Sequence, residues 1–199
     1  GENLTGFELM NSSCIQAVEK HLPSCKIPLS SLCPWQILIE VGNITTDQNN
    51  DERMVVFLEK ALETTLITDG IVANSMQERK DFWRIRHAIP EAEKYTGPAI
   101  YHDISVPISK IPELIEQSIA ELEEYIGTST VFAFGHVGDG NLHFTKVKPA
   151  SMDKAPFLNE TANVHRIVHE VAVKLGGSFS AEHGIGTKLK NELEHFSDP

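Results

Sequence analysis

The sequence predicts an α+β fold: a mostly antiparallel, ferredoxin-like sheet with helices packed on one face. Segments that alternate apolar and polar residues, as half-buried strands do, are interspersed with segments that repeat apolar residues at helical spacing. Two of the strand segments are separated by Asp139-Gly140, a dipeptide typical of tight hairpins. An antiparallel hairpin combined with split β-α-β connections is characteristic of ferredoxin-like sheets.

The N-terminal part is expected to begin with a helix over residues 3–21, whose apolar residues recur on one side and which ends near Pro23. Residues 35–41 are mostly β-branched and apolar, which predicts a strand. Apolar residues at helical spacing predict a helix at 51–66, and a short apolar run predicts a second strand at 70–74.

The remaining elements follow from the same two patterns, with Ser109 as the residue that caps the start of one helix. In order, they are a helix at 78–92, a strand at 99–106, a helix at 110–126, hairpin strands at 130–136 and 142–147, a helix at 155–175 and a strand at 177–181. No repeat, low-complexity tract or flexible linker interrupts them, so residues 1–199 are expected to form one domain.

Composition excludes several classes of function. The hydrophobic content of 41% and the charged content of 23% are those of a soluble globular protein. The net charge of −11 argues against binding to nucleic acid or to an anionic bilayer. Cys14, Cys25 and Cys33 lack the spacing of a metal or redox motif. With no signal peptide and no membrane-spanning run, these features predict a cytoplasmic protein, and they are compatible with peripheral membrane association of a longer one.

The segment from Phe134 to Phe144 gives the strongest indication of chemistry. If Asp139-Gly140 forms a two-residue turn, His136 lies opposite His143, with Cβ atoms roughly 4.5–5.5 Å apart. Two imidazoles at that separation can hold one divalent cation, and Glu182, in a second glycine-rich segment, is the natural third ligand. Alternatively, the two histidines stack or share a hydrogen bond, and Asp139-Gly140 is only a turn.

Other polar residues have plainer explanations. Arg86 could bind a substrate carboxylate through its bidentate fork, but the residues alone favour a solvent-exposed salt bridge with a nearby acidic side chain. Arg84 points to another side of the helix. The adjacent residues His102-Asp103 face opposite sides of a strand, so they are not expected to pair. His165 and His169 have a spacing that can bind metal, but they flank the apolar stripe of their helix and are predicted to be solvated.

Three segments together resemble one family: Phe134 to His143, Ser180 to Gly186, and Trp83 to Glu93 followed by His102 to Pro107. They look like the C-terminal substrate domain of the FAD-linked oxidases, the family of D-lactate dehydrogenase, glycolate oxidase and D-2-hydroxyglutarate dehydrogenase. The resemblance covers most of the chain. It implies that an N-terminal flavin-binding domain and an extreme C-terminal tail are absent here, and that the fragment is inactive alone.

The resemblance also implies roles for individual residues. His136, His143 and Glu182 match ligands of a divalent metal, with zinc as the expected ion, which would polarise the 2-hydroxyl of the substrate. His183 matches the general base that takes the hydroxyl proton while hydride passes to FAD, which the absent N-terminal domain mainly binds. Arg86 matches the arginine that binds the substrate carboxylate.

The substrate site departs from the pattern of D-2-hydroxyglutarate dehydrogenase. Pro90 and Tyr101 stand where that enzyme has a threonine and a lysine that serve the substrate, so recognition of a distal carboxylate is in doubt. A monocarboxylic D-2-hydroxy acid therefore fits as well as 2-hydroxyglutarate, with Tyr101 among the substrate-binding residues. Asn141, near the metal in the motif, is expected to orient a ligand or the hairpin.

The partners that follow are a small 2-hydroxy acid, the flavin-binding domain of the same polypeptide, an unidentified electron acceptor and a second copy in a homodimer. Two other functions remain compatible with the sequence. A stand-alone zinc hydrolase could use the same histidines and glutamate to activate water. In a non-catalytic interaction domain, the histidines would be structural.

Overall fold

The computed structural model describes residues 3–29, 33–42, 50–186 and 190–196. The chain forms two compact units, Gly1–Tyr95 and Thr96–Pro199. Each unit combines helices with antiparallel strands, which confirms the predicted α+β class. No helix in the described part of the chain is both long and apolar enough to cross a membrane.

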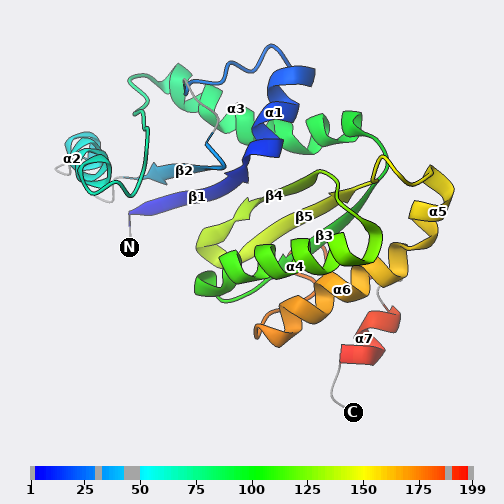
Figure 1. The fold of residues 1–199 in the computed structure, drawn as a ribbon. Coiled ribbons are helices and arrows are strands. Elements are labelled where there is room, and N and C mark those ends of the chain that lie inside the picture. The colour runs from blue at the N-terminus through cyan, green and yellow to red at the C-terminus, as the bar shows by residue number, and fades with distance from the viewer. Residues whose placement is uncertain (1–2, 30–32, 43–49, 187–189, 197–199) are drawn as a thin grey trace. The chain divides into compact units, whose positions relative to one another are not determined.

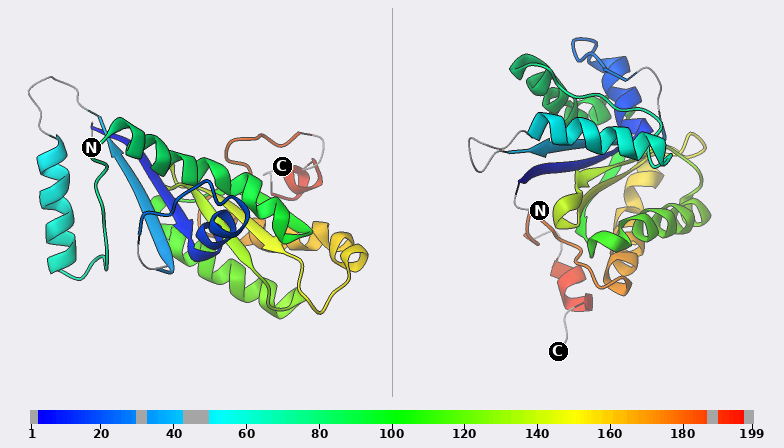
Figure 2. Two further views of the ribbon diagram at one scale, coloured as in Figure 1. Left: turned by 90° about the horizontal axis from the view of Figure 1, so that it is seen from above. Right: turned by 90° about the vertical axis from the view of Figure 1, so that its left-hand side faces the viewer.

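The first unit is built on one antiparallel pair of strands, in which Phe7 lies opposite Ile39. Its elements are β1 (Leu4–Asn11), α1 (Ser12–His21), β2 (Trp35–Val41), α2 (Asn50–Glu63), α3 (Met76–Ala92) and a 3-10 helix at Glu93–Thr96 that continues into the second unit. Helices α1 and α3 pack together through buried side chains that include Ile15 and Ile89, whereas α2 lies away from both (Figures 1 and 2).

The predicted helix over residues 3–21 is wrong in its first half, which is strand β1. The helix begins only after Asn11, whose side-chain oxygen accepts a hydrogen bond from the backbone N–H of Cys14 at 3.2 Å. A capping asparagine supplies the acceptor that the first helical turn lacks, so it fixes where the helix starts. The strand predicted at 35–41 and the helix predicted at 78–92 are confirmed, but residues 70–74 form no strand.

The second unit is a three-stranded antiparallel sheet in the order β4-β5-β3. Its elements are β3 (Ala99–Ser105), a 3-10 turn at Ile108–Lys110, α4 (Ile111–Ile126), β4 (Val131–His136), a 3-10 turn at Val137–Asp139, β5 (Asn141–Val147), α5 (Lys154–Asn159), α6 (Thr161–Lys174) and α7 (Lys190–Phe196). Helices α4 and α6 cover one face of this sheet, as predicted (Figure 1). The core between them contains the fully buried Ile104, Leu142, Phe144, Leu114 and Val168.

Several boundaries differ from the prediction. The helix expected at 155–175 is two helices that meet at Glu160. Ser109 lies in the 3-10 turn before α4 and does not cap it. That helix instead starts with Pro112, which suits the first turn because its missing N–H has no partner there anyway. The strand expected at 177–181 is reduced to one bridge between Ser178 and Ser105.

The predicted two-residue hairpin turn is also wrong. Phe134, not His136, lies opposite His143, and a 3-10 turn follows His136 before the chain re-enters β5. Gly140 adopts the left-handed conformation, with φ of 75°, and its carbonyl accepts a hydrogen bond from Val106 N at 3.0 Å. This bond ties the turn to the end of β3, so the connection is wider than the Asp-Gly dipeptide alone suggests.

Candidate metal and catalytic site

The pairing of β3 with β5 sets which side chains share a face of the sheet. Asp103 lies directly opposite His143, and Ser105 lies opposite Asn141. Because every second residue of a strand points to the same side, Tyr101 and Asn141 belong to the face that carries Asp103 and His143. The alternate residues face the covering helices.

Asp103 also holds a segment distant in sequence against the edge strand β3. Its Oδ2 atom accepts hydrogen bonds from the backbone N–H groups of Glu182 at 2.8 Å and His183 at 2.9 Å. Its backbone carbonyl accepts another from Ala181 N at 3.1 Å. These bonds bring the Glu182 and His183 side chains beside the face that carries His143.

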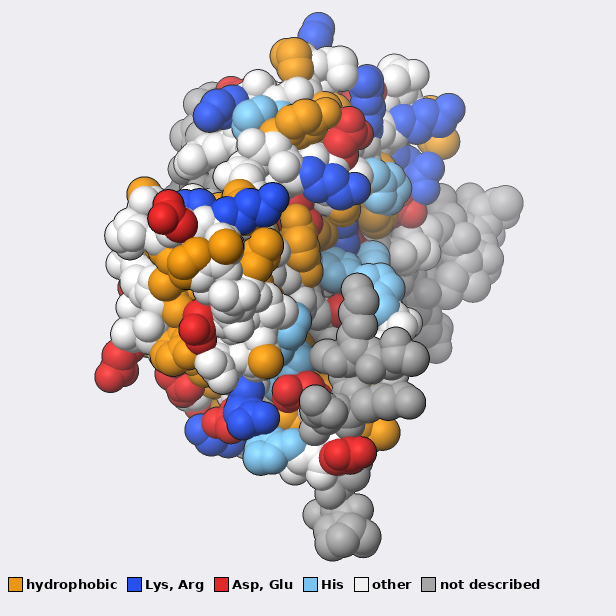
Figure 3. All heavy atoms as spheres, turned by 90° about the vertical axis from the view of Figure 1, so that its right-hand side faces the viewer, with side chains coloured by type: hydrophobic (Ala, Val, Ile, Leu, Met, Phe, Trp, Pro, Cys, Tyr) orange, Lys and Arg blue, Asp and Glu red, His pale blue; other side chains and the backbone are white. Residues whose placement is uncertain are grey.

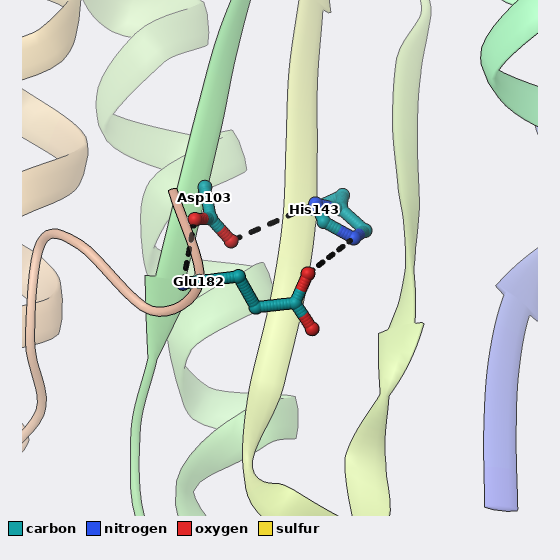
Figure 4. Close-up of side chains that lie close together, drawn as sticks. All are labelled: Asp103, His143 and Glu182. Carbon is teal, nitrogen blue, oxygen red and sulfur yellow. Dashed lines mark hydrogen bonds and ion pairs between the residues drawn. The ribbon is translucent and has the colours of Figure 1, made fainter. Parts of the chain in front are cut away.

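The four predicted metal and catalytic side chains thus lie together, as Figure 4 shows for two of them with Asp103. Glu182 Oε1 is 3.5 Å from His136 Nε2, and Glu182 Oε2 is 4.0 Å from His143 Nε2. The rings of His136 and His143 are 6.5 Å apart between centroids, although their residues are not paired in the sheet. His183 stacks near His143 at 6.0 Å.

The donor atoms fit a small divalent cation. Ligands on a tetrahedral zinc ion lie roughly 3.3 Å from one another, given metal–ligand distances of about 2.0–2.2 Å. The measured separations of 3.5 and 4.0 Å need only small side-chain movements to reach that value. Two imidazole nitrogens with one carboxylate form a donor set that zinc accepts readily. The side chains of His136 and Glu182 are each 41% exposed, so an ion can reach them.

A second grouping of donors shares two of these residues. One ligand atom from each of Asp103, His143 and Glu182 lies within 4.8 Å of the others. Asp103, however, faces Nδ1 of His143 at 3.7 Å, whereas Glu182 faces Nε2 of the same ring. An imidazole offers a metal one nitrogen at a time, so an ion between His143 Nε2 and Glu182 leaves Asp103 on the other side of the ring.

Asn141 lies in the same face with its polar atoms unused. The residue is 5% exposed, and within the described part of the chain neither its side-chain nitrogen nor its oxygen has a hydrogen-bond partner. A buried amide in that state costs about 1–3 kcal/mol. The role of Asn141 in orienting a ligand or the hairpin stays a prediction.

Arg86, in α3 of the first unit, forms a buried ion pair. Its Nε donates to Glu8 Oε2 at 2.7 Å, and the side-chain exposures are 6% and 3%. The solvent-exposed salt bridge considered for Arg86 is therefore wrong. Its role in binding a substrate carboxylate stays a prediction.

Three histidines gather on the opposite, helix-covered face of the sheet. The ring of His102 is 4.8 Å from that of His165 and 5.7 Å from that of His169, between centroids. His169 is only 2% exposed, and its Nδ1 is 3.3 Å from Glu192 Oε2. The prediction that His165 and His169 are solvated is wrong, because a strand distant in sequence, β3, packs its own histidine against them.

Burial controls the protonation of this cluster. Burial, with a smaller effect of the neighbouring His169, lowers the pKa of His165 to about 4, and Glu192 opposes the shift. Burial likewise lowers the pKa of His102 well below its usual value and lowers that of His169. The three rings are therefore neutral near pH 7.

A cavity of about 350 Å³ lies along β3, between this cluster and the candidate site. Tyr101 and Asp103 line it together with His165 and His183. Ligand pockets for small molecules begin at roughly this size. Histidine side chains are exposed near acidic ones on the face of the molecule shown in Figure 3.

Asp103 is the site residue that sequence reasoning missed. Its position in an alternating strand, out of phase with the buried Ile104, indicated that it faces away from the core. Only the pairing of β3 with β5 places it beside His143, and that register is not readable from local sequence.

Comparison with known proteins agrees with the expected resemblance. The model of the family "FAD linked oxidases, C-terminal domain" matches residues 1–199. The chain is 34% identical over 201 residues to a mitochondrial D-2-hydroxyglutarate dehydrogenase of Danio rerio, covering 100% of this chain and 35% of that protein. It is 32% identical over 199 residues to D-2-hydroxyglutarate dehydrogenase of Stutzerimonas stutzeri strain A1501, covering 99% of the chain and 42% of that protein. The chain thus spans well under half the length of these relatives. Since the match extends over all of its residues, the chain belongs to the family of FAD-linked oxidase C-terminal domains.

Proposed function

We propose that this chain is the substrate- and metal-binding part of a longer, flavin-dependent D-2-hydroxy-acid dehydrogenase. The proposed reaction oxidises a 2-hydroxy acid to the 2-oxo acid by hydride transfer to FAD. The observation that supports it most directly is the convergence of His136, His143, Glu182 and His183 beside β3. Family membership supports the flavin, and the relatives' names support the hydroxy acid.

In this proposal His136, His143 and Glu182 hold a divalent ion, zinc by the chemistry of its donors. When bound, such an ion acts as a Lewis acid on the substrate oxygen and lowers the pKa of the hydroxyl. Glu182 contributes its two oxygens from one side, facing Nε2 of both imidazoles. The backbone bond from Glu182 to Asp103 keeps this carboxylate at the site.

His183 takes the proton from the substrate hydroxyl. Its Nδ1 is 3.3 Å from Asp103 Oδ2, which leaves Nε2 as the nitrogen that receives the proton. The side chain is 71% exposed and also lines the cavity along β3, so a small hydroxy acid can reach it. Imidazole suits this role because it exchanges protons near neutral pH.

The substrate is a D-2-hydroxy acid bound partly through Asn141 and Tyr101. The unpaired amide of Asn141 offers both a donor and an acceptor, and Tyr101 is half-exposed on the same face. With Pro90 and Tyr101 at the positions of the threonine and the lysine, a monocarboxylic acid fits as well as a dicarboxylic one, and the relatives described above are named for D-2-hydroxyglutarate. Arg86 is the proposed partner of the substrate's 1-carboxylate.

Partners and location stay at the level of proposals. A flavin-binding domain of the same polypeptide and an external electron acceptor are required by the reaction. A homodimer and a cytoplasmic location remain predictions, and the Danio rerio relative is named as mitochondrial.

The test is anaerobic flavin bleaching in the full-length protein, mixed with a panel of D- and L-2-hydroxy acids. Loss of the oxidised flavin band with one or more D-acids supports the proposal, and His183→Ala should slow it at least 100-fold, the lower range for a general base. His195→Ala is the matched control, since that imidazole is half-exposed and belongs to α7. If the protein contains flavin and metal but no acid in the panel bleaches the flavin, the proposal is refuted.

A further inference from the structure

We infer that Asp103 is a positioning residue that sets the protonated nitrogen of two imidazoles at once, those of His143 and His183. The inference rests on the proposed roles of these histidines as metal ligand and proton acceptor. An imidazole that binds a metal or takes a proton through Nε2 must carry its hydrogen on Nδ1. Asp103 is the group that faces Nδ1 in both rings.

The geometry at His143 is the first step. Asp103 Oδ1 is 3.7 Å from His143 Nδ1, and this buried oxygen has no hydrogen-bond partner among the residues that the structure describes. An ionised carboxylate only accepts hydrogen bonds, so the adjacent ring nitrogen is favoured in its N–H form. Nε2 then presents its lone pair toward Glu182, 4.0 Å away, where the ion is proposed to bind.

The geometry at His183 repeats this arrangement with the other oxygen. Asp103 Oδ2 is 3.3 Å from His183 Nδ1 and also accepts the backbone N–H bonds of Glu182 and His183. The backbone bonds fix the position of the main chain at His183, and the carboxylate determines which nitrogen of its ring carries the hydrogen. Carboxylates that orient metal-bound histidines in this way typically change metal affinity by about 10- to 100-fold.

The rival role for Asp103 is that of a metal ligand, together with His143 and Glu182. Its contacts favour positioning. Oδ2 accepts hydrogen bonds from two backbone N–H groups and faces Nδ1 of His183. Oδ1 faces Nδ1 of His143, on the side of that ring away from Glu182. A ligand atom at Oδ1 would lie on the Nδ1 side of His143, whereas Glu182 faces Nε2 of the same ring.

The deciding variant is Asp103→Asn in the full-length protein. An amide oxygen can still accept the two backbone bonds, but the amide NH2 then faces His143 Nδ1 and favours the hydrogen on Nε2. Asp153→Asn is the matched control, since Asp153 is exposed, makes no side-chain cap and loses the same charge. Metal affinity is measured by competition with a coloured zinc chelator. Histidine tautomers are read from long-range ¹H–¹⁵N spectra of the metal-free protein, assigned with His143→Gln and His183→Gln.

The expected result is a zinc affinity roughly 10- to 100-fold weaker in Asp103→Asn than in the wild type or in Asp153→Asn. The wild-type spectra should show both histidines with hydrogen on Nδ1. Asp103→Asn should move the hydrogen to Nε2 in His143 alone, because the amide oxygen that keeps the backbone bonds still faces Nδ1 of His183. Weaker zinc binding with unchanged tautomers would make Asp103 a direct ligand and overturn the inference. Hydrogen on Nε2 in the folded wild type would overturn it without any variant. If the wild type binds no zinc but Asp103→Asn still changes the tautomer of His143, the metal proposal fails and the positioning role of Asp103 stands.

Discussion

Acid should destabilise the second unit through its buried histidines, and His165 allows the size of the effect to be worked out. Its pKa is lowered from 6.5 to about 4, chiefly by burial. A base with a lowered pKa binds fewer protons when folded than when unfolded. Its contribution to stability is therefore complete above the unfolded value of 6.5 and is lost as the pH falls toward the folded value of about 4.

At pH 5 the unfolded imidazole is almost fully protonated and the folded one is mostly neutral. The difference corresponds to about 2 kcal/mol of unfolding free energy lost relative to pH 7, at about 1.4 kcal/mol per pKa unit. The pKa values of His102 and His169 are also lowered, so they add to the loss in the same direction.

The assay is urea unfolding at both pH values, followed by hydrogen exchange of peptides from α6 and corrected for intrinsic exchange rates. His165→Gln removes the titrating group. Between pH 7 and pH 5 its free energy of unfolding should therefore fall by about 2 kcal/mol less than that of the wild type. His195→Gln, which removes a half-exposed imidazole, should behave as the wild type. Equal pH sensitivity in His165→Gln and the wild type would refute the reasoning.

Two further predictions concern packing. Glu8→Gln removes the negative charge from the buried ion pair with Arg86 and should cost about 3–5 kcal/mol in the first unit, measured by urea unfolding. A change below 1 kcal/mol would contradict the buried pair. Gly140→Ala places a Cβ against the Val106 carbonyl oxygen, whereas Gly176→Ala, at a similar positive φ of 79°, meets open space. Both substitutions incur the strain of a left-handed residue, about 1–2 kcal/mol, so the thermal stability of Gly140→Ala should fall clearly below that of Gly176→Ala. Similar melting temperatures for the two variants would count against the close approach of the turn to β3.

The site residues were predictable because strand alternation and a glycine-rich motif mark them in the sequence. His136, His143 and Glu182 do come together, although the reason given for the first two was wrong. Asp-Gly signals a reversal of the chain, but the bond from Val106 to Gly140 decides how wide the reversal is. A wide turn shifts the register, and His136 reaches Glu182 from the end of β4 instead of from a paired position.

Long-range partners account for what the sequence did not reveal. Residues 3–11 have apolar positions compatible with either period, and pairing with β2 makes them a strand. His165 and His169 flank an apolar stripe, so local pattern leaves them in solvent. In the structure His169 is buried and His165 is half-buried, and His102, about sixty residues earlier in the chain, supplies a third ring against them.

The two sides of β3 explain why histidines in the second unit have different properties. His102 and Asp103 are neighbours in sequence, but one faces the helices and the other faces the candidate site. On the helix side, burial keeps the imidazoles neutral and makes them contributors to pH-dependent stability. On the other side, a carboxylate accepts hydrogen bonds from the chain and faces the rings of His143 and His183. One face of β3 thus contributes to pH-dependent stability, and the other carries Asp103 beside the residues that we propose to perform the chemistry.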